Sequence, residues 1–130
     1  MDQLRDYVSK ELACGAIAGP FNSNPFNTNC VISPLLCVPK RDSLSPRVVH
    51  DLSFPEGRSV NSFIPKNTYL GEDFTLRLPG VDRLTEFILL KGPGCHIFKL
   101  DLRRAYRQIP VDPADSHLLG FSVDDQFYFH

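Results

Sequence analysis

The sequence has almost no net charge, no long apolar run and no close cysteine pairs, and each absence excludes a class of protein. It contains 14 Lys and Arg against 15 Asp and Glu, a formal net charge of -1. Any nucleic-acid surface must therefore come from local clusters of cations. No stretch approaches the roughly 18 apolar residues of a membrane span, and the N-terminus lacks the features of a signal peptide. We expect an intracellular protein, in the cytoplasm or the nucleus, with no membrane partner.

Two common site motifs are also missing. The four cysteines stand too far apart for the close pairs that zinc sites use, and we interpret them as reduced, mostly buried thiols: Cys14, Cys30, Cys37 and Cys95. A phosphate-binding glycine loop is absent, because Gly92–Gly94 is not followed by Lys and then Ser or Thr. The sequence therefore excludes a structural zinc site built from close cysteine pairs, and it excludes nucleotide binding through a glycine-rich loop.

What is present fits one ordinary domain. The chain has 130 residues, of which 42% are apolar and 22% are charged, values near those of globular proteins. Widespread disorder is therefore a poor interpretation. The 11 prolines and 8 glycines indicate many turns.

Two segments carry apolar residues at helical spacing. Residues 3–14 do so until glycines and a proline interrupt the pattern, and residues 80–94 place four apolar side chains on one face before a Lys-Gly-Pro-Gly stop. A further helical turn is expected near Pro113. Residues 54–74 have no sustained period and are predicted to form an extended connector.

Two hairpins are predicted. Residues 30–53 contain two apolar runs around the polar stretch KRDSLSP, which predicts a hairpin with a basic tip. Residues 119–123 and 126–130 predict two short strands around Asp124 and Asp125.

The segment CHIFKLDL, residues 95–102, alternates at strand period. Its even-numbered residues from 98 onwards would face a core, and Asp101 would stand on the opposite face. A lone Asp at a strand end is usually a cap or a surface group, but it can also hold a hard divalent cation through oxygen. Cations and an aromatic residue surround it: Lys99, Arg103, Arg104, Tyr106 and Arg107. Together these features indicate phosphoryl transfer on nucleotides.

Two sequence blocks resemble retroelement reverse transcriptases. Residues 99–121, KLDLRRAYRQIPVDPADSHLLGF, resemble the first catalytic block, typically "DL..AY.QI". Residues 33–61, SPLLCVPKRDSLSPRVVHDLSFPEGRSVN, resemble the fingers segment. The blocks stand in the family's order, and the resemblance covers roughly residues 10–130. The stretches GAIAGPF, DLSFPEGRSVN and KGPG look most like retrotransposons of the DIRS kind, with long-terminal-repeat elements second.

The resemblance implies an α+β fold that comprises the fingers and the start of the palm of a right-hand DNA/RNA polymerase, truncated. It implies an N-terminal helix and lead-in, a fingers-like hairpin and connector, the start of the palm with the first catalytic strand, and an incomplete returning fingers segment, at residues 1–24, 25–78, 79–110 and 111–130. Because the chain stops within a predicted strand, we expect a fragment. The rest of the polyprotein, with the remaining palm, the thumb and an RNase H-like region, would be missing.

The resemblance also implies a role for each matching residue. Asp101 matches the first metal-binding aspartate, which with its partner holds two Mg²⁺ ions that activate the primer 3′-hydroxyl and neutralise the leaving pyrophosphate. Four residues match positions at the incoming dNTP: Lys40, Arg47, Leu102 and Tyr106. In the family the aromatic residue is a steric gate against the ribose 2′-hydroxyl, and the two cations close over the triphosphate. Lys40 and Arg47 also fit a solvated hairpin tip.

The arginines that follow Asp101 have two interpretations. Arg103, Arg104 and Arg107 could contact phosphates of the template-primer, or pair with Asp112 and Asp115.

A second carboxylate source is needed for two-metal chemistry, normally a hairpin with an aromatic-x-Asp-Asp sequence. Ser122 stands where the aromatic residue would be, so Asp124 and Asp125 are predicted to form a hairpin turn. His50, beside Asp51, is predicted to be structural.

The function expected of the intact protein is template-directed DNA synthesis from dNTPs, by an RNA-directed DNA polymerase, a nucleotidyltransferase. Whether this chain is itself an enzyme stays open, because it contains only the first carboxylate motif. One alternative is a non-catalytic nucleic-acid-binding or interaction remnant of a retrotransposon. A third possibility is an inactive gene fragment that folds poorly, because apolar faces made for absent strands are exposed.

Overall fold

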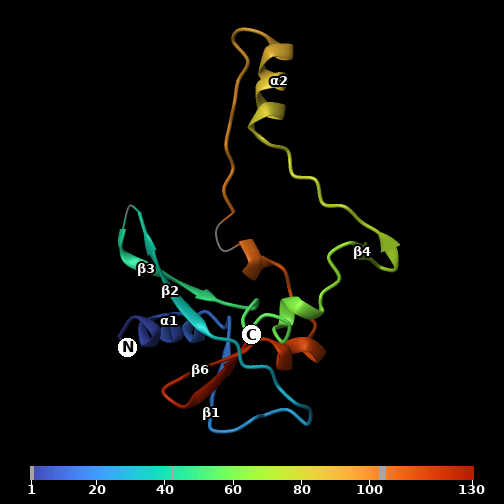
Figure 1. Ribbon diagram of the computed structural model, residues 1–130. Coiled ribbons are helices and arrows are strands. Elements are labelled where there is room, and N and C mark those ends of the chain that lie inside the picture. The colour runs from blue at the N-terminus through green and yellow to red at the C-terminus, as the bar shows by residue number, and fades with distance from the viewer. Residues whose placement is uncertain (1, 42, 103–104) are drawn as a thin grey trace. The chain divides into compact units, whose positions relative to one another are not determined.

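The computed structural model of the protein describes residues 2–41, 43–102 and 105–130, except the side chains of residues 43–45 and 107. The chain forms two compact units (Figure 1). Unit 1 comprises Met1–Ile64 and Tyr106–His130, and unit 2 comprises Pro65–Ala105. Helices and strands both occur, so the expected mixed α and β class is confirmed.

A three-stranded antiparallel sheet lies in unit 1, in the order β1-β7-β6. Its strands are β1 (Ala18–Phe21), β6 (Gly120–Val123) and β7 (Gln126–Phe129). Val123 pairs with Gln126, so Asp124 and Asp125 are the two residues of a tight turn. Both have positive φ, 52° and 61°, as a two-residue hairpin of this kind requires at both central positions. The predicted hairpin and its turn are confirmed.

The core of unit 1 forms where helix α1 (Asp2–Ala13) meets this sheet. Its buried apolar cluster is Val8, Ile17, Phe121, Val123 and Tyr128. Phe121 is fully buried and stacks on Tyr128, with ring centroids 5.5 Å apart and planes 16° apart. The helical spacing read from the first residues therefore reflects the face that α1 buries.

The predicted basic hairpin is formed by β2 (Leu35–Lys40) and β3 (Ser43–His50). The base of the hairpin is attached to the core through His50, whose Nε2 donates to the Gly120 carbonyl at 3.1 Å. Its ring also meets Phe121 edge-on, with centroids 5.5 Å apart. The structural role predicted for His50 is confirmed.

Short helical turns complete unit 1. They are η1 (Val60–Phe63) and η3 (Pro113–Leu118), while η2 (Ala105–Gln108) begins in unit 2 and continues into unit 1. The Asp112 side chain accepts a hydrogen bond from the Ala114 backbone at 2.9 Å, which caps η3 at its proline start. The turn expected near Pro113 is therefore confirmed.

Unit 2 contains helix α2 (Val81–Lys91) and a small hairpin of β4 (Thr68–Tyr69) and β5 (Glu72–Asp73). The helix ends at Gly92, which has a φ of 81° and donates to the Ile88 carbonyl, as the stop signal predicted. None of the side chains of α2 is buried. Residues 54–74, predicted as an extended connector, include the small hairpin and η1.

The strand predicted for residues 95–102 is wrong, because this segment has no regular secondary structure. The residues expected to face a core are exposed: Phe98 at 82%, Leu100 at 83% and Leu102 at 66%. A strand requires a neighbouring backbone to accept and donate its hydrogen bonds, and no described residue supplies one to this segment. Alternation in a sequence specifies the faces of a strand but not its partner.

The burial expected of the cysteines is also wrong. All four are free thiols, but Cys14 and Cys37 are exposed and Cys30 and Cys95 are only partly buried. The core is too small to cover them, since it is concentrated where α1 meets the sheet. In the part of the chain described here, no helix combines the length and apolar character needed to cross a membrane.

Candidate functional site

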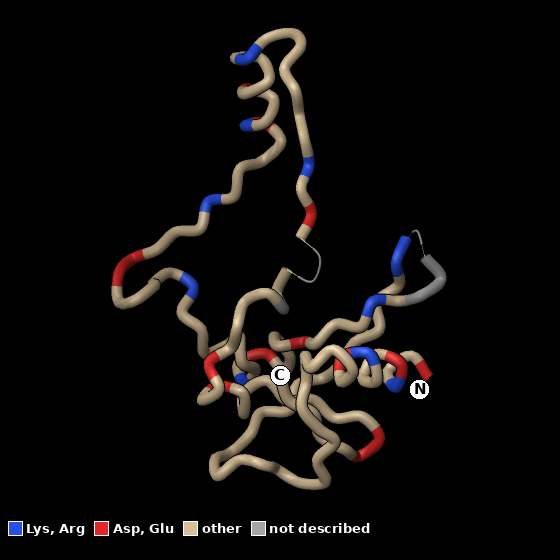
Figure 2. The backbone as a smooth tube through the Cα atoms, turned by 180° about the vertical axis from the view of Figure 1, so that it is seen from behind, with Lys and Arg blue, Asp and Glu red and all other residues tan. Residues whose placement is uncertain are grey.

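The β2–β3 hairpin presents the two predicted triphosphate-binding cations to solvent. Lys40 ends β2, and Arg47 lies in β3 opposite Val38. Both residues are exposed, and the cations of this hairpin lie toward its tip (Figure 2). The ladder is irregular between Val38 and Lys40, so the two cations come from a distorted end of the hairpin.

Neither cation is neutralised by a carboxylate of the described residues. The ion pairs there are Arg5–Asp124, Lys10–Asp6 and Arg83–Glu86. Lys40 and Arg47 can therefore bind an external anion, the first as a point charge and the second as a planar fork that matches two phosphate oxygens.

Asp101 and Leu102 lie in the irregular segment of unit 2, where both are exposed. No ion pair or hydrogen bond joins the Asp101 carboxylate to another described residue. Mg²⁺ prefers an octahedral shell of oxygen ligands. Within the described ranges, no group of three or more His, Cys, Asp or Glu side chains could hold a metal ion. The donors described here do not complete a magnesium site, so the metal role of Asp101 stays a prediction.

Tyr106 lies in η2 and is 91% exposed, so its ring is available to a flat partner. Arg103 and Arg104 lie outside the described residues, as does the side chain of Arg107. Their predicted contacts with phosphate, or with Asp112 and Asp115, therefore stay predictions.

The predicted site residues are divided between the two units. Unit 1 holds Lys40, Arg47 and Tyr106, and unit 2 holds Asp101 and Leu102. Within unit 1, the cations come from a hairpin and the aromatic ring from η2, elements that lie far apart in the sequence.

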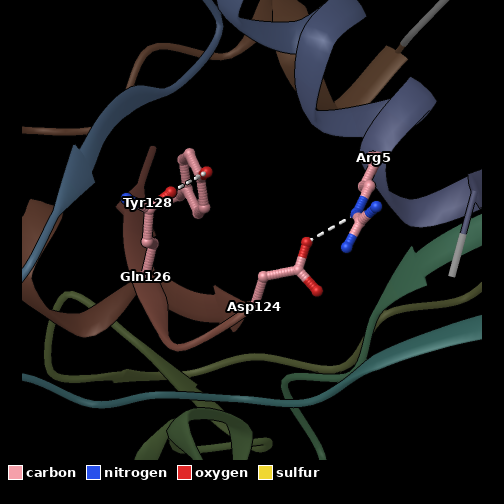
Figure 3. A network of polar contacts seen from close by, with 4 residues as sticks. All are labelled: Arg5, Asp124, Gln126 and Tyr128. Atoms are coloured by element: carbon pink, nitrogen blue, oxygen red, sulfur yellow. Dashed lines mark hydrogen bonds and ion pairs between the residues drawn. The ribbon is translucent and has the colours of Figure 1, made fainter.

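The Asp124–Asp125 turn makes a contact that the sequence did not reveal. Arg5 Nε donates to Asp124 Oδ2 at 2.7 Å, which joins α1 to the β6–β7 turn (Figure 3). On the next strand, the Tyr128 hydroxyl donates to Gln126 Oε1 at 3.3 Å. The hydrogen bond from Arg5, aided by its charge, lowers the pKa of Asp124, and the same contact raises the pKa of Arg5.

Sequence reasoning had no signal for this pair, because the two residues are 119 positions apart. The pair gives Asp124 a structural partner and agrees with the prediction of a turn rather than a second catalytic hairpin.

An open groove in unit 2 was also missed. It has a volume of about 600 Å³ and lies between α2 and the residues after it. Leu84, Phe87 and Ile88 line it from the helix, and residues 93–98 line it from the following segment. The helical face recognised in the sequence is thus real, but within the described residues it faces a groove and not a core.

No family model, curated protein or solved structure matches the chain. The function of the chain must therefore be inferred from its own residues and from the two sequence blocks that resemble reverse transcriptases.

Proposed function

We propose that the chain supplies the fingers cations, the sugar gate and the first metal-binding carboxylate of a reverse transcriptase, of the DIRS-like or long-terminal-repeat kind. The intact enzyme would extend a DNA primer on an RNA or DNA template. The observation that carries the proposal is the exposure of Lys40, Arg47, Asp101 and Tyr106. Cations and carboxylates with a structural role are commonly paired. Lys40, Arg47 and Asp101, in contrast, take no part in the ion pairs between described residues.

Each residue has a definite task in this proposal. Lys40 and Arg47 bind triphosphate oxygens through charge-assisted hydrogen bonds. Tyr106 places its ring against the sugar, where a 2′-hydroxyl would collide with it. Asp101 contributes oxygen ligands to Mg²⁺, which when bound would activate the primer hydroxyl and neutralise the leaving pyrophosphate.

A second candidate function is a nucleic-acid-binding remnant that has no polymerase activity. The ion pair between Arg5 and Asp124 favours it, because it engages a carboxylate of the only Asp-Asp pair in the chain in a structural contact. This candidate retains the cations of the β2–β3 hairpin and dispenses with the metal role of Asp101.

Binding of a fluorescent primer-template, followed by anisotropy over a range of salt concentrations, tests what both candidates share. Replacing Lys40 and Arg47 with Ala should weaken binding and reduce the slope of log K against log salt by about 1.4 to 1.8, the value for two phosphate contacts. A matched control replaces Arg58 and Lys66 with Ala, which removes two exposed positive charges elsewhere. Equal losses of affinity in the two double variants would show that only net charge matters and would contradict the role of the hairpin.

A further inference from the structure

Residues 97–102 form an amphipathic segment without a backbone partner among the described residues. The segment follows α2 as an extended coil (Figure 1). Phe98, Leu100 and Leu102 are all strongly exposed. A segment with strand alternation and unpaired N–H and C=O groups is a template for pairing with another strand.

The charges of this segment are arranged symmetrically about one residue. Lys99 precedes Leu100 and Asp101 follows it, and the apolar residues Phe98 and Leu102 flank both. Such a sequence is complementary to itself when a second copy runs in the opposite direction.

We infer that this segment pairs with the same segment of a second copy of the chain, as an antiparallel two-stranded ladder centred on Leu100. On one face, Leu100 lies opposite its counterpart and Phe98 lies opposite Leu102 of the second copy. On the other face, Lys99 lies opposite Asp101 of the second copy, twice by symmetry. Opposite charges and large apolar residues in directly facing positions both stabilise a ladder.

Other registers are disfavoured by the same residues. A ladder centred on Lys99 or on Asp101 places like charges directly opposite each other, which is destabilising. A shift by one residue places apolar side chains opposite charged ones, because the apolar side chains of the second copy move to the face that carries the charges of the first copy. A parallel pair in register places Lys99 beside Lys99 and Asp101 beside Asp101. Charge complementarity therefore selects both the direction and the register.

The size of the contact predicts a weak dimer. A pair of five-residue strands, residues 98–102 of each copy, buries less than the ~1,200 Å² of a stable interface. The groove beside α2 is continuous with the segment through Ile97 and Phe98, and it adds apolar surface there. We expect a dimer with a dissociation constant of about 10 μM or weaker, which forms as concentration rises.

This pairing goes beyond the proposed function and does not depend on it. A copy engaged in the ladder has its Asp101 carboxylate opposite a lysine of the second copy, and so cannot offer that carboxylate to a cation at the same time. The hairpin cations Lys40 and Arg47 take no part. Primer-template binding through the hairpin and dimer formation can therefore fail independently.

Sedimentation equilibrium of the whole chain over a range of concentrations tests the pairing. Lys99→Asp or Asp101→Lys alone places like charges opposite each other and should weaken the dimer by tenfold or more. The swapped variant Lys99→Asp/Asp101→Lys restores both charge pairs and should restore the wild-type dissociation constant. Matched controls, Lys66→Asp and Glu56→Lys, make the same changes in net charge at exposed positions outside the segment and should leave the dimer unchanged.

Four outcomes would overturn the inference. They are a wild-type monomer at every concentration, a dimer that the single reversals leave intact, a swap that fails to restore association, and growth into larger species. Circular dichroism of each variant checks that unit 1 stays folded. The segment is exposed, so its substitutions should not alter that signal.

A cysteine placed on the symmetry axis tests the register directly. Residues directly opposite in an antiparallel pair have Cα atoms about 4.5 to 5.5 Å apart, within the range of a disulfide. Leu100→Cys should therefore give a 100–100 cross-link on mild oxidation, identified by peptide mapping. Phe98→Cys is the control, because its two copies would stand roughly 14 Å apart. A 98–98 link as efficient as the 100–100 link would contradict the register.

Discussion

Arg5 and Asp124 show how one side-chain pair connects two elements that the sequence keeps apart. The bond at 2.7 Å joins α1 to the β6–β7 turn, and the Asp124 side chain is 33% exposed. Exposed pairs of this kind contribute little to stability, because water and salt screen the charges. The main consequence of the Arg5–Asp124 pair is for the proposed function, since the pair gives Asp124 a structural contact in place of the metal contact that an Asp-Asp sequence suggests.

The stability difference between wild type and Asp124→Asn should depend on pH. Asn also adopts positive φ, so the turn should survive the change. The Asp124 pKa in the folded chain lies below its ordinary value of 3.8. The ion pair therefore contributes fully above the unfolded pKa, and its contribution is lost as pH falls through the lowered folded pKa. Urea unfolding should show wild type modestly more stable at pH 7 and the difference vanishing in strong acid.

Asp125→Asn is the matched control for this measurement. It removes the same charge from the adjacent turn residue, which also has positive φ but forms no ion pair with a described residue. We expect no pH-dependent difference from this change. Equal pH dependence in the two variants would assign the effect to general charge and contradict the role of Arg5.

Elements of similar apolar content differ greatly in what they bury. Strand β6 buries three of its four residues, whereas α2 buries none. The sequence predicts both elements: α2 from the period of its apolar residues, which indicates the side chains that share a face, and β6 from its place beside the Asp124–Asp125 turn. Burial depends instead on whether another element covers that face.

Phe121→Ala and Phe63→Ala compare the same chemical change in two elements of unit 1. Phe121 lies in β6 and is fully buried, so its loss leaves a cavity and should destabilise the unit by about 3–5 kcal/mol. Phe63 lies in η1 and is largely exposed, so its loss should change stability by less than about 0.5 kcal/mol. Chemical denaturation followed by circular dichroism measures both. A similar loss of stability in the two variants would contradict the assignment of the core.

At the scale of the whole molecule, the division into two units separates the proposed binding residues Lys40, Arg47 and Tyr106 from Leu102 and from the proposed metal ligand Asp101. Unit 1 has a core, a sheet and the basic hairpin, while unit 2 carries Asp101 on an exposed segment. Unit 1 therefore contains the two cations proposed to bind the triphosphate, and the carboxylate proposed to bind the metal belongs to unit 2. This division leads to different expectations for binding and for catalysis.

We expect the 130-residue chain to add no nucleotide to a primer-template with Mg²⁺ or Mn²⁺, although it binds that primer-template. Asp101 supplies one carboxylate, and Asp124 is paired with Arg5. Two-metal transfer requires carboxylates from more than one source. A gel assay with labelled primer measures extension, and anisotropy on the same sample confirms binding. Extension that is lost in Asp124→Asn/Asp125→Asn would show that the turn carries metal ligands.

Only part of the candidate site could be predicted from the sequence. The hairpin around Lys40 and Arg47 was predictable because turn residues between two apolar runs specify it locally. The pairing of Arg5 with Asp124 was not predictable, because no local rule relates residues so distant in the chain. The strand expected around Asp101 is wrong, because alternation specifies the two faces of a strand but does not supply the neighbouring backbone with which it must pair.

The sequence by itself determined the local elements of this protein. These are α1, α2, both larger hairpins and the Asp124–Asp125 turn, for which periodicity, caps and turn residues act over a few positions. Only the tertiary structure decided which apolar faces are covered and that Asp124 pairs with Arg5. It also decided that no described residue pairs with the backbone of residues 95–102. The reason is that local conformation depends on neighbouring residues, whereas burial and pairing depend on surfaces that distant parts of the chain bring together.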